Sequence, residues 1–374
     1  MPRKKAKPRR ARKTKVPVLE AIRQRIDAVD AGLVRLISRR ATLAQGIAGI
    51  KQEQGAGNGT YYRPEREAQI LRRILGRNPG PLADEEMARL FREIMSACLA
   101  LEQPLNIAYL GPEGTFTQTA AHKHFGRSIR STAFASIDQV FREVESGACH
   151  CGVVPVENSI EGVVNHTLDM LVNSSLRICG EIELRIHQHL LSRAKAAQRI
   201  RCVYSHQQSL AQCRRWLDNH LLHAERIPVN SNAEAARRAA ADSTAAAVAG
   251  ESAAELYRLP VLSRNIEDEP DNTTRFLVLG PYATPPSGCD KTSILFTTAN
   301  RPGALHQTLK CFSDHGVNMV RIESRPSRRG MWDYVFFVDV DGHAEDPSVA
   351  AAIHQLEAST SMVKLLGSYP RSQI

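Results

Sequence analysis

Three short polar clusters are the parts of this 374-residue sequence best suited to chemistry. They occupy residues 155–159 (PVENS), 271–276 (DNTTRF) and 323–326 (ESRP), and each adjoins apolar runs that are typical of strands. Polar groups at strand ends are costly to bury unless they are paired. We therefore expect these clusters to line pockets.

The elements that must position the first two clusters alternate between short apolar runs and helical segments over residues 104–283. This alternation predicts an α/β domain. In such a domain the carboxyl ends of the strands open onto a ligand crevice, so we expect the polar strand-end groups to converge there. The candidate crevice residues are Thr117, Glu157, Asn158, Ser159, Ser205, Gln208, Gln212, Thr273, Thr274 and Arg275.

A purely structural alternative is that these residues make ordinary turn and strand-end hydrogen bonds. The turn at residues 111–117 (GPEGTFT) is rich in glycine, but it lacks both the GxGxxG pattern and the phosphate-binding lysine pattern. The sequence also shows no nucleophile–base pair, no metal-ligand cluster and no cofactor motif. We therefore expect neither a metal nor a cofactor.

Residues 17–103 have a helical pattern. Apolar residues recur there at three- and four-residue steps, beginning with Ile22, Ile26 and Val29, and they predict a first helix of about 35 residues. A helix that long cannot bury its apolar stripe against itself. The pattern therefore predicts an all-α domain that pairs with a second copy, as a homodimer or a higher even-numbered oligomer.

Several cations of this helical domain could form a pocket for a small dicarboxylate. Arg40 and Lys51 share one face of the first helix, and Arg23 is turned away by about a quarter turn, where it would more easily serve a neighbouring subunit. Arg66 joins from the second helix, and Glu102 lies one turn beyond Cys98 on the third. A dimeric bundle with cations reaching from its surface explains the same spacing equally well.

Residues 289–374 form a separate domain after a proline-containing linker. Its elements follow the order strand, helix, strand, strand, helix, strand, which predicts an α+β ferredoxin-like fold. Two loops could form a site there: residues 301–305 join the first strand to a helix, and residues 323–326 end the second strand.

The net charge of +10 is concentrated at the N-terminus, because residues 1–15 hold nine cations and no acid. We expect residues 1–16 to be a disordered basic tail, and nucleic-acid binding is the alternative that we weigh and do not adopt. No apolar run approaches the roughly 18 residues that a membrane span needs, and no secretory signal is present. Eight scattered cysteines favour a reducing compartment, so a cytoplasmic location is expected.

Residues 19–102 resemble the all-helical chorismate mutases. In that family three arginines and a lysine bind the two carboxylates and the ether oxygen of chorismate, and an acid bonds its hydroxyl. The resemblance assigns these roles to Arg23, Arg40, Lys51, Arg66 and Glu67, with Arg23 reaching across a dimer. Three positions depart from the pattern of some members: Arg63, Cys98 and Glu102.

Glu102 is the departure with a chemical consequence, because some relatives have a glutamine that donates a hydrogen bond to the ether oxygen. A carboxylate cannot donate a hydrogen bond, whereas a carboxylic acid can. We therefore expect mutase activity that requires protonated Glu102 and falls as pH rises.

Residues 105–280 resemble prephenate dehydratase through GPEGTFT, PVENS, YSHQQ and NTTRF. The resemblance implies two α/β lobes around a cleft, in which prephenate loses water and carbon dioxide to give phenylpyruvate. It assigns to Thr274 the protonation of the leaving hydroxyl, and to Arg275 a substrate carboxylate. The other candidate crevice residues would line the cleft.

Residues 291–367 resemble an ACT regulatory domain. In dehydratases of this kind the two loops border a phenylalanine site at a dimer interface. We expect phenylalanine to lower dehydratase activity, and removal of residues 288–374 to abolish that response. A simple dimerisation module is the alternative, and His306 stands where some relatives have an aliphatic residue. The implied effector residues are Gly303, Ala304, Leu305, Asn318, Glu323, Ser324, Arg325 and Pro326.

Together the three resemblances indicate a multidomain, bifunctional enzyme of phenylalanine biosynthesis. It would act on chorismate and prephenate and respond to L-phenylalanine. Two alternatives stay open: a dehydratase whose helical arm serves only for dimerisation, and a catalytically inactive sensor of amino acids.

Overall fold

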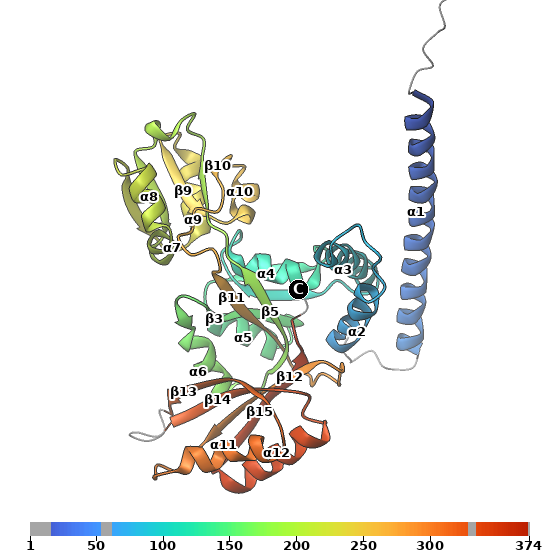
Figure 1. Cartoon of the computed structure of the whole chain (residues 1–374), viewed down its shortest axis with the longest axis vertical. Helices are drawn as coiled ribbons and strands as arrows, with labels where there is room; N and C mark the ends of the chain where they lie inside the picture. The colour runs from blue at the N-terminus through green and yellow to red at the C-terminus, as the bar shows by residue number, and fades with distance from the viewer. Residues whose placement is uncertain (1–15, 54–61, 328–333, 373–374) are drawn as a thin grey trace, which may run out of the picture. The chain divides into compact units, whose positions relative to one another are not determined.

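The computed structural model describes residues 16–53, 62–327 and 334–372 (Figure 1). The chain divides into two compact units, residues 1–58 and residues 59–374. The predicted fold classes are confirmed, because the described residues form helical, α/β and α+β parts in that order. No helix among the described residues is both long and apolar enough to cross a membrane.

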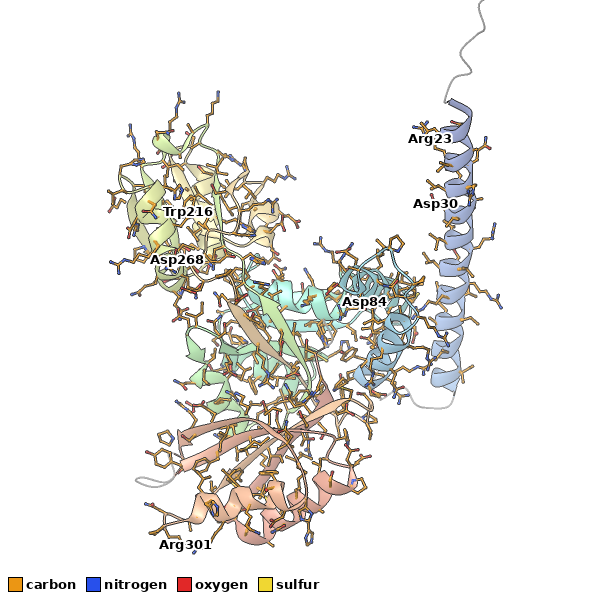
Figure 2. The ribbon with its side chains drawn as sticks, in the orientation of Figure 1. Arg23, Asp30, Asp84, Trp216, Asp268 and Arg301 are labelled. Atoms are coloured by element: carbon orange, nitrogen blue, oxygen red, sulfur yellow. The ribbon has the colours of Figure 1, made fainter. Side chains whose placement is uncertain are left out.

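The first unit contains one long helix, α1 (Val16–Glu53), of 38 residues. Its apolar residues are exposed, as shown by Ile26 at 53% and Val29 at 62%. Figure 2 labels Arg23 and Asp30 on this helix. An exposed apolar stripe of this length is expected of a helix that pairs with another chain.

Helices α2 (Pro64–Leu75) and α3 (Asp84–Ala100) open the second unit. Pro64 begins α2, where the amide hydrogen that proline lacks would have no helical partner. The acidic residues Asp84, Glu85 and Glu86 occupy the first turn of α3, where their negative charges interact favourably with the positive end of the helix dipole and stabilise the helix. The two helices pack together through Leu71, Ala88 and Met95.

The α/β part has two lobes, each built on a mixed sheet. The first sheet has the order β2-β1-β3-β11-β5, with β4 beside β3. Strand β11 lies antiparallel between β3 and β5, although it is far from both in the sequence. The strands are β1 (Asn106–Leu110), β2 (Arg130–Phe134), β3 (Cys151–Asn158), β4 (Gly162–Val163), β5 (Arg177–Arg185) and β11 (Thr273–Gly280), and the helices are α4 (Phe116–Phe125), α5 (Ile137–Glu145) and α6 (Asn165–Asn173).

The second lobe has the sheet order β10-β6-β9-β7-β8. The chain enters this lobe after β5 and leaves it before β11, so two crossing segments connect the lobes. Its strands are β6 (His189–Ser192), β7 (Cys202–His206), β8 (Glu225–Val229), β9 (Ala245–Ala249) and β10 (Val261–Ser263), and its helices are η1 (Ala197–Arg199), α7 (Gln207–Gln212), α8 (Arg214–His220), α9 (Asn232–Ala241) and α10 (Glu251–Tyr257).

The C-terminal domain is the predicted ferredoxin-like arrangement. Its antiparallel sheet has the order β13-β14-β12-β15, and helices α11 and α12 pack on one face. The elements are β12 (Asp290–Thr297), α11 (Ala304–Asp314), β13 (Met319–Pro326), β14 (Tyr334–Asp341), α12 (Pro347–Ser359) and β15 (Met362–Pro370).

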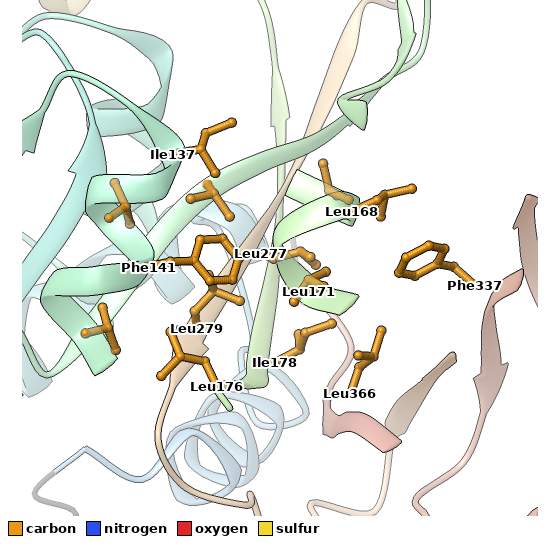
Figure 3. Close-up of a cluster of buried hydrophobic side chains, with 14 of the residues drawn as sticks. Ile137, Phe141, Leu168, Leu171, Leu176, Ile178, Leu277, Leu279, Phe337 and Leu366 are labelled. Carbon is orange, nitrogen blue, oxygen red and sulfur yellow. The ribbon is translucent and has the colours of Figure 1, made fainter. Parts of the chain in front are cut away.

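The other face of this sheet packs on the first lobe, and the two share one hydrophobic core. Figure 3 shows Leu168 and Leu171 of α6 and Ile178 of β5 beside Phe337 and Leu366 of the C-terminal sheet. The contact includes backbone, because a Cβ placed on Gly367 would meet the carbonyl oxygen of Ile178. The C-terminal domain is therefore structurally continuous with the first lobe.

Candidate active sites

A cleft of about 470 Å³ lies between the two lobes. The first lobe contributes the turn before α4 and the ends of β3 and β11, and the second lobe contributes the starts of α7 and α9. The segments that cross between the lobes contribute Ile186, Gln188 and Asn272. Of the predicted crevice residues, the cleft brings together Thr117, Asn158, Gln208, Gln212 and Thr274.

Thr274 and Asn158 form a pair at the centre of the polar residues in this cleft. They are directly opposed in the β3–β11 ladder, and Nδ2 of Asn158 donates to Oγ1 of Thr274 at 2.8 Å. Oδ1 of Asn158 accepts from the backbone amides of Ile160 and Glu161, each at 3.0 Å. Because these two donors occupy the amide oxygen, the amide nitrogen must face Thr274. The threonine oxygen is thus an acceptor toward Asn158, which leaves its own proton available for donation.

Asn272 fixes the same amide from a second direction. It is 1% exposed, and its Oδ1 accepts from Nδ2 of Asn158 at 2.7 Å. Its own Nδ2 donates to Oε1 of Gln212 at 3.1 Å, which links the end of β11 to α7 in the second lobe. This chain of amides joins the two lobes across the cleft.

The second-lobe side of the cleft is organised by Asn232 at the start of α9. Its Oδ1 accepts from Oγ of Ser205 at 3.0 Å and from the backbone amide of His206 at 3.1 Å. Its Nδ2 donates to Oγ of Ser209 at 2.9 Å. Ser205 is fully buried, and its one hydroxyl proton is shared between Asn232 and the carbonyl of Val248, which is nearer at 2.6 Å, so Ser205 supports the wall and does not line the cleft.

No lysine or arginine is found among the described residues that line the cleft. Two helix N-termini border it: α4, preceded by Thr115, and α9, preceded by Ser231, whose hydroxyl accepts from the amide of Glu234. The carboxylate of Glu161 also lines the cleft and accepts from Nε2 of Gln212 at 3.3 Å. Free amide hydrogens and the helix dipole favour an anion at a helix N-terminus. The arrangement therefore suits a carboxylate-bearing ligand.

Arg275 and Glu157 do not lie where the sequence led us to expect, because both face away from the cleft. Arg275 donates to Glu181 at 2.9 Å and to Asp339 at 2.7 Å, and Arg321 donates to Glu157 at 2.8 Å. Side chains alternate between the faces of a sheet, so Arg275 points opposite to Thr274. In this structure Arg275 is therefore not available to a ligand in the cleft.

Two further candidates also lie outside the cleft lining. Oγ of Ser159 accepts from the backbone amide of Thr273 at 3.0 Å, and Oγ1 of Thr273 donates to the carbonyl of Asp271 at 3.3 Å. These hydrogen bonds are local and lie at the end of the β3–β11 ladder. For Ser159 and Thr273 the structure therefore agrees with the alternative of ordinary strand-end hydrogen bonding.

The polar cleft residues that sequence reasoning missed include Asn232 and Asn272. Asn272 stands inside the DNTTRF cluster, so its place there was a usable signal. Asn232 lies at the start of an alanine-rich helix, where an asparagine is typical of a helix start and attracts no attention.

The candidate mutase residues fall in both units of the chain. Arg23, Arg40 and Lys51 lie on α1, whereas Arg63 and Arg66 lie at the start of α2, where both are exposed. Nε of Arg63 donates to Oε1 of Glu65 at 2.8 Å, and Glu67, half-buried on α2, lines a small cavity of about 50 Å³ with Tyr62 and Arg92.

Cys98 lies on the last turn of α3, and Glu102 lies four residues later, just beyond the end of that helix. Cys98 is 3% exposed. Oε2 of Glu102 is buried and has no hydrogen-bond partner among the described residues. A buried carboxyl oxygen without a partner is an unfavourable arrangement that a proton or a hydrogen-bonded ligand would relieve.

The candidate effector residues fall at both ends of the C-terminal sheet: residues 303–305 follow the end of β12 and residues 323–326 end β13, whereas Asn318 precedes β13, beside Asp341 at the other end. Gly303 precedes α11 with φ of 77°, a conformation that favours glycine. Strand β13, which carries residues 323–326, is an edge strand, and its side chains alternate between half-buried and exposed. Nδ2 of Asn318 donates to Asp341 at 2.8 Å, and Arg325 donates to Asp169 of α6 at 3.0 Å.

The described residues contain no group of cysteine, histidine and acidic side chains that could hold a metal ion. The densest such stretch in the sequence, residues 149–151, is accounted for structurally. Nδ1 of His150 accepts from the backbone amide of Asn106 at 2.8 Å, and burial raises the pKa of Cys151 to about 12, so its thiol stays protonated.

Comparison with known proteins gives three consecutive family matches. They are chorismate mutase type II over residues 22–103, prephenate dehydratase over residues 107–283 and the ACT domain over residues 292–358. The bifunctional chorismate mutase/prephenate dehydratase of Pseudomonas aeruginosa is 54% identical over 357 residues, which span 95% of this chain and 98% of that protein. The protein of the same description from Neisseria gonorrhoeae is 50% identical, over 93% of this chain and 96% of its own length.

A solved structure shows the same architecture for most of the chain. The prephenate dehydratase of Arthrobacter aurescens, determined in complex with L-Phe, matches with a TM-score of 0.67 and 34% identity. The match covers 71% of this chain and 90% of that one.

Proposed function

This chain belongs to the bifunctional chorismate mutase/prephenate dehydratases, and from that membership we propose which residues act in each reaction and how the C-terminal domain controls the second. The enzyme has two activities. Its mutase rearranges chorismate to prephenate, and its dehydratase converts prephenate to phenylpyruvate. We assign the mutase domain to residues 17–103, the dehydratase domain to residues 104–283 and the ACT domain to residues 289–374.

Thr274 is the proton donor of the dehydratase. In the reaction the bond between the ring and its carboxylate breaks and releases carbon dioxide, and the electron pair moves into the ring. The carbon–oxygen bond at the opposite ring carbon then breaks, and the leaving hydroxide takes the Thr274 proton to become water, while the Thr274 oxygen regains a proton from solvent. The observation that carries this assignment is the hydrogen bond from Asn158, which uses Oγ1 as an acceptor and directs the threonine proton elsewhere.

Neutral donors hold the dianionic substrate. The N-termini of α4 and α9 supply amide hydrogens and partial positive charge, and Gln208 and Gln212 supply side-chain amides. This recognition replaces the role that we had expected of Arg275. Formation of an aromatic ring supplies the driving force, so one directed proton and a fixed substrate are sufficient.

We assign the mutase roles residue by residue from the family membership, and we propose that the active mutase is a homodimer. Arg40, Lys51 and Arg66 hold the carboxylates and the ether oxygen, Glu67 bonds the hydroxyl, and Arg23 reaches across from the partner. The exposed stripe of α1, from Leu19 to Ile50, supports a homodimer because burial of each such side chain contributes about 1.5–3 kcal/mol. The rearrangement needs no nucleophile, so positioning and electrostatic stabilisation supply the acceleration.

The Glu102→Gln variant is expected to keep or exceed the wild-type mutase activity, because an amide can donate to the ether oxygen, whereas a carboxylate cannot. The substitution also gives the buried, unpartnered Oε2 position of Glu102 a neutral group. The measurement is kcat/KM for chorismate, compared between the two proteins. A large loss of mutase activity in the glutamine variant would remove Glu102 from this role.

Phenylalanine is proposed to bind the ACT domain at Gly303, Ala304, Leu305, Asn318 and residues 323–326, and to inhibit the dehydratase. Support comes from the related structure that holds L-Phe and from the exposed edge of β13, where a second ACT domain would complete the site. Inhibition requires that phenylalanine favours one of two global states.

A single assay tests the whole assignment. The purified full-length chain, free of metal and coenzyme, is incubated with chorismate while prephenate and phenylpyruvate are followed, with and without millimolar phenylalanine. We expect both products without phenylalanine and a slower appearance of phenylpyruvate with it. Unconsumed chorismate would contradict the mutase assignment, prephenate that accumulates without phenylpyruvate would contradict the dehydratase assignment, and an unchanged phenylpyruvate rate would contradict the regulation.

The full-length chain is needed in this assay. Removal of residues 288–374, the test that the sequence suggested, would expose the core shared by Phe337 and Leu366 with the first lobe.

We also propose a cytoplasmic location, since all eight cysteines are free thiols and seven of them are buried or half-buried.

A further inference from the structure

Four charged residues connect the ACT domain to the dehydratase sheet, and we call them the charge quartet: Glu157, Arg275, Arg321 and Asp339. Glu157 and Arg275 are directly opposed in the β3–β11 ladder. Arg321 and Asp339 are directly opposed in the β13–β14 ladder of the ACT domain. Across the interface Nε of Arg321 donates to Glu157 at 2.8 Å, and Nη1 of Arg275 donates to Asp339 at 2.7 Å. Each sheet thus contributes one cation and one anion.

The quartet is well shielded from water. The side chains of Arg275, Asp339 and Arg321 are 11%, 6% and 13% exposed, and that of Glu157 is 37% exposed. Burial alone would raise the pKa of Asp339, but Arg275, Ser293 and Arg321 together lower it, so its carboxylate is ionised. Charge pairs at such low exposure keep their geometry, because breaking one leaves an uncompensated buried charge.

Further contacts anchor the quartet on both sides of the interface. Arg275 also bonds Glu181 of β5 and the hydroxyl of Tyr369, and Lys291 of β12 donates to Glu181 at 2.7 Å. Oγ of Ser293 donates to Asp339. The dehydratase and ACT sheets therefore cannot shift relative to each other without changing the position of Arg275 or Glu157.

The dehydratase end of the quartet is adjacent to the proton donor. Asn158 and Thr274 are the next residues along the same two strands, they are also directly opposed, and they face the cleft. A β-bulge lies beside the pair, since Arg275 and Phe276 are opposed by Glu157 and Pro155. A movement of Glu157 or Arg275 on one face of the ladder therefore changes the position of Asn158 and Thr274 on the other.

The ACT end of the quartet is adjacent to the effector motif. Arg321, Glu323 and Arg325 alternate with exposed residues along β13, so they share the half-buried face of that strand. The same strand is an edge of the sheet, with a hydrogen-bonded neighbour only at β14 among the described strands. A ligand at residues 323–326 would therefore act on the strand that carries Arg321.

We propose that the charge quartet is the positioning link through which phenylalanine at the ACT domain controls the Asn158–Thr274 pair. This inference rests on the proposed inhibition by phenylalanine. The quartet does not contact the substrate. Its role is to transmit the position of β13 and β14 to the ladder that holds the proton donor.

Arg321→Gln and Asp339→Asn test the link with minimal disturbance. Glu157 is partly exposed and can be hydrated, and Arg275 keeps Glu181 when Asp339 is neutralised. We expect both variants to bind phenylalanine with wild-type affinity by calorimetry and to keep dehydratase activity without it. The ratio of activities without and with saturating phenylalanine should fall by about 5-fold or more.

Lys364→Gln is the matched control, because Lys364 also connects the two domains but does not touch the quartet. Its ammonium donates to the carbonyls of Leu171, Val172 and Ser174 at the end of α6. This variant should retain the full response to phenylalanine. The double variant Glu157→Gln and Arg321→Gln should lose no more of the phenylalanine response than either single variant, because each change removes the same Glu157–Arg321 pair.

A measurement on the wild type does not depend on the folding of any variant. Hydrogen exchange of the amides at the ends of β3 and β11 should change when phenylalanine binds. Three results would each contradict the role of the quartet while leaving the regulation intact. They are wild-type inhibition of both quartet variants, loss of the phenylalanine response in Lys364→Gln, and unchanged hydrogen exchange in β3 and β11. If phenylalanine does not inhibit the wild type at all, the proposed regulation fails and this inference fails with it.

Discussion

Thr274→Ala is expected to lower dehydratase kcat/KM by about 100-fold to about 10,000-fold, the contribution usually made by a positioned general acid. The physical reason is the loss of the hydroxyl that Asn158 holds in the cleft. Without it, the hydroxide must leave without a directed proton. Mutase activity should be unchanged, because the candidate mutase residues all lie between residues 23 and 102, outside the lobes that hold Thr274.

Two neighbouring variants make this prediction specific. Thr274→Ser keeps a hydroxyl and should recover most of the activity. Thr273→Ala removes the adjacent threonine, whose hydroxyl donates to the carbonyl of Asp271 outside the cleft, and should have little effect. Measurement of kcat/KM for prephenate and for chorismate on each variant checks the assignment. If Thr274→Ala dehydrates prephenate at the wild-type rate, the donor is another group.

Arg40→Ala should lower mutase kcat/KM by about 100-fold or more while dehydratase activity persists, because a preorganised donor to the developing charge is removed. Arg40 is half-buried on α1. Its neighbour Arg39 is exposed and points about 100° away on the helix, so Arg39→Ala is the matched control and should retain activity. Equal losses in the two variants would mean that only the general positive charge of α1 matters.

The same residues test whether the mutase site combines two chains. Arg23→Ala alone should also be inactive as a mutase, because its arginine serves the partner's site. A mixed dimer of one Arg23→Ala chain and one Arg40→Ala chain contains one complete site and should recover about half of the wild-type activity. The mixed dimer is obtained by co-expression with two different tags. No recovery would place Arg23 and Arg40 in one site on one chain.

Much of the fold could be predicted from local patterns. Apolar residues at three- and four-residue steps predicted the long helix that the structure shows as α1, and Pro64 marked the start of α2. The order of strands and helices after residue 288 predicted the ferredoxin-like domain. These patterns are reliable because hydrogen bonds within a helix, and the alternation of faces along a strand, depend on residues close in sequence.

The cleft itself was partly predictable, and for a similar reason. Asn158 and Thr274 are polar residues at strand ends, and such residues in an α/β domain gather where the strands end. Their hydrogen bond, however, depends on β11 lying beside β3. These two strands are more than 100 residues apart in the chain, so no local pattern predicts that Asn158 and Thr274 are paired.

What the sequence by itself determined is therefore which residues stand at strand ends and helix starts, and hence the types of group available for chemistry. Only the tertiary structure decided which of these groups meet. Arg275 looked like a carboxylate ligand because it follows Thr274, yet it belongs to the interface with the ACT domain. The reason is physical: neighbours on a strand point to opposite faces, and a side chain bonds to whatever the fold packs against its own face, in this case an acid 64 residues further along the chain.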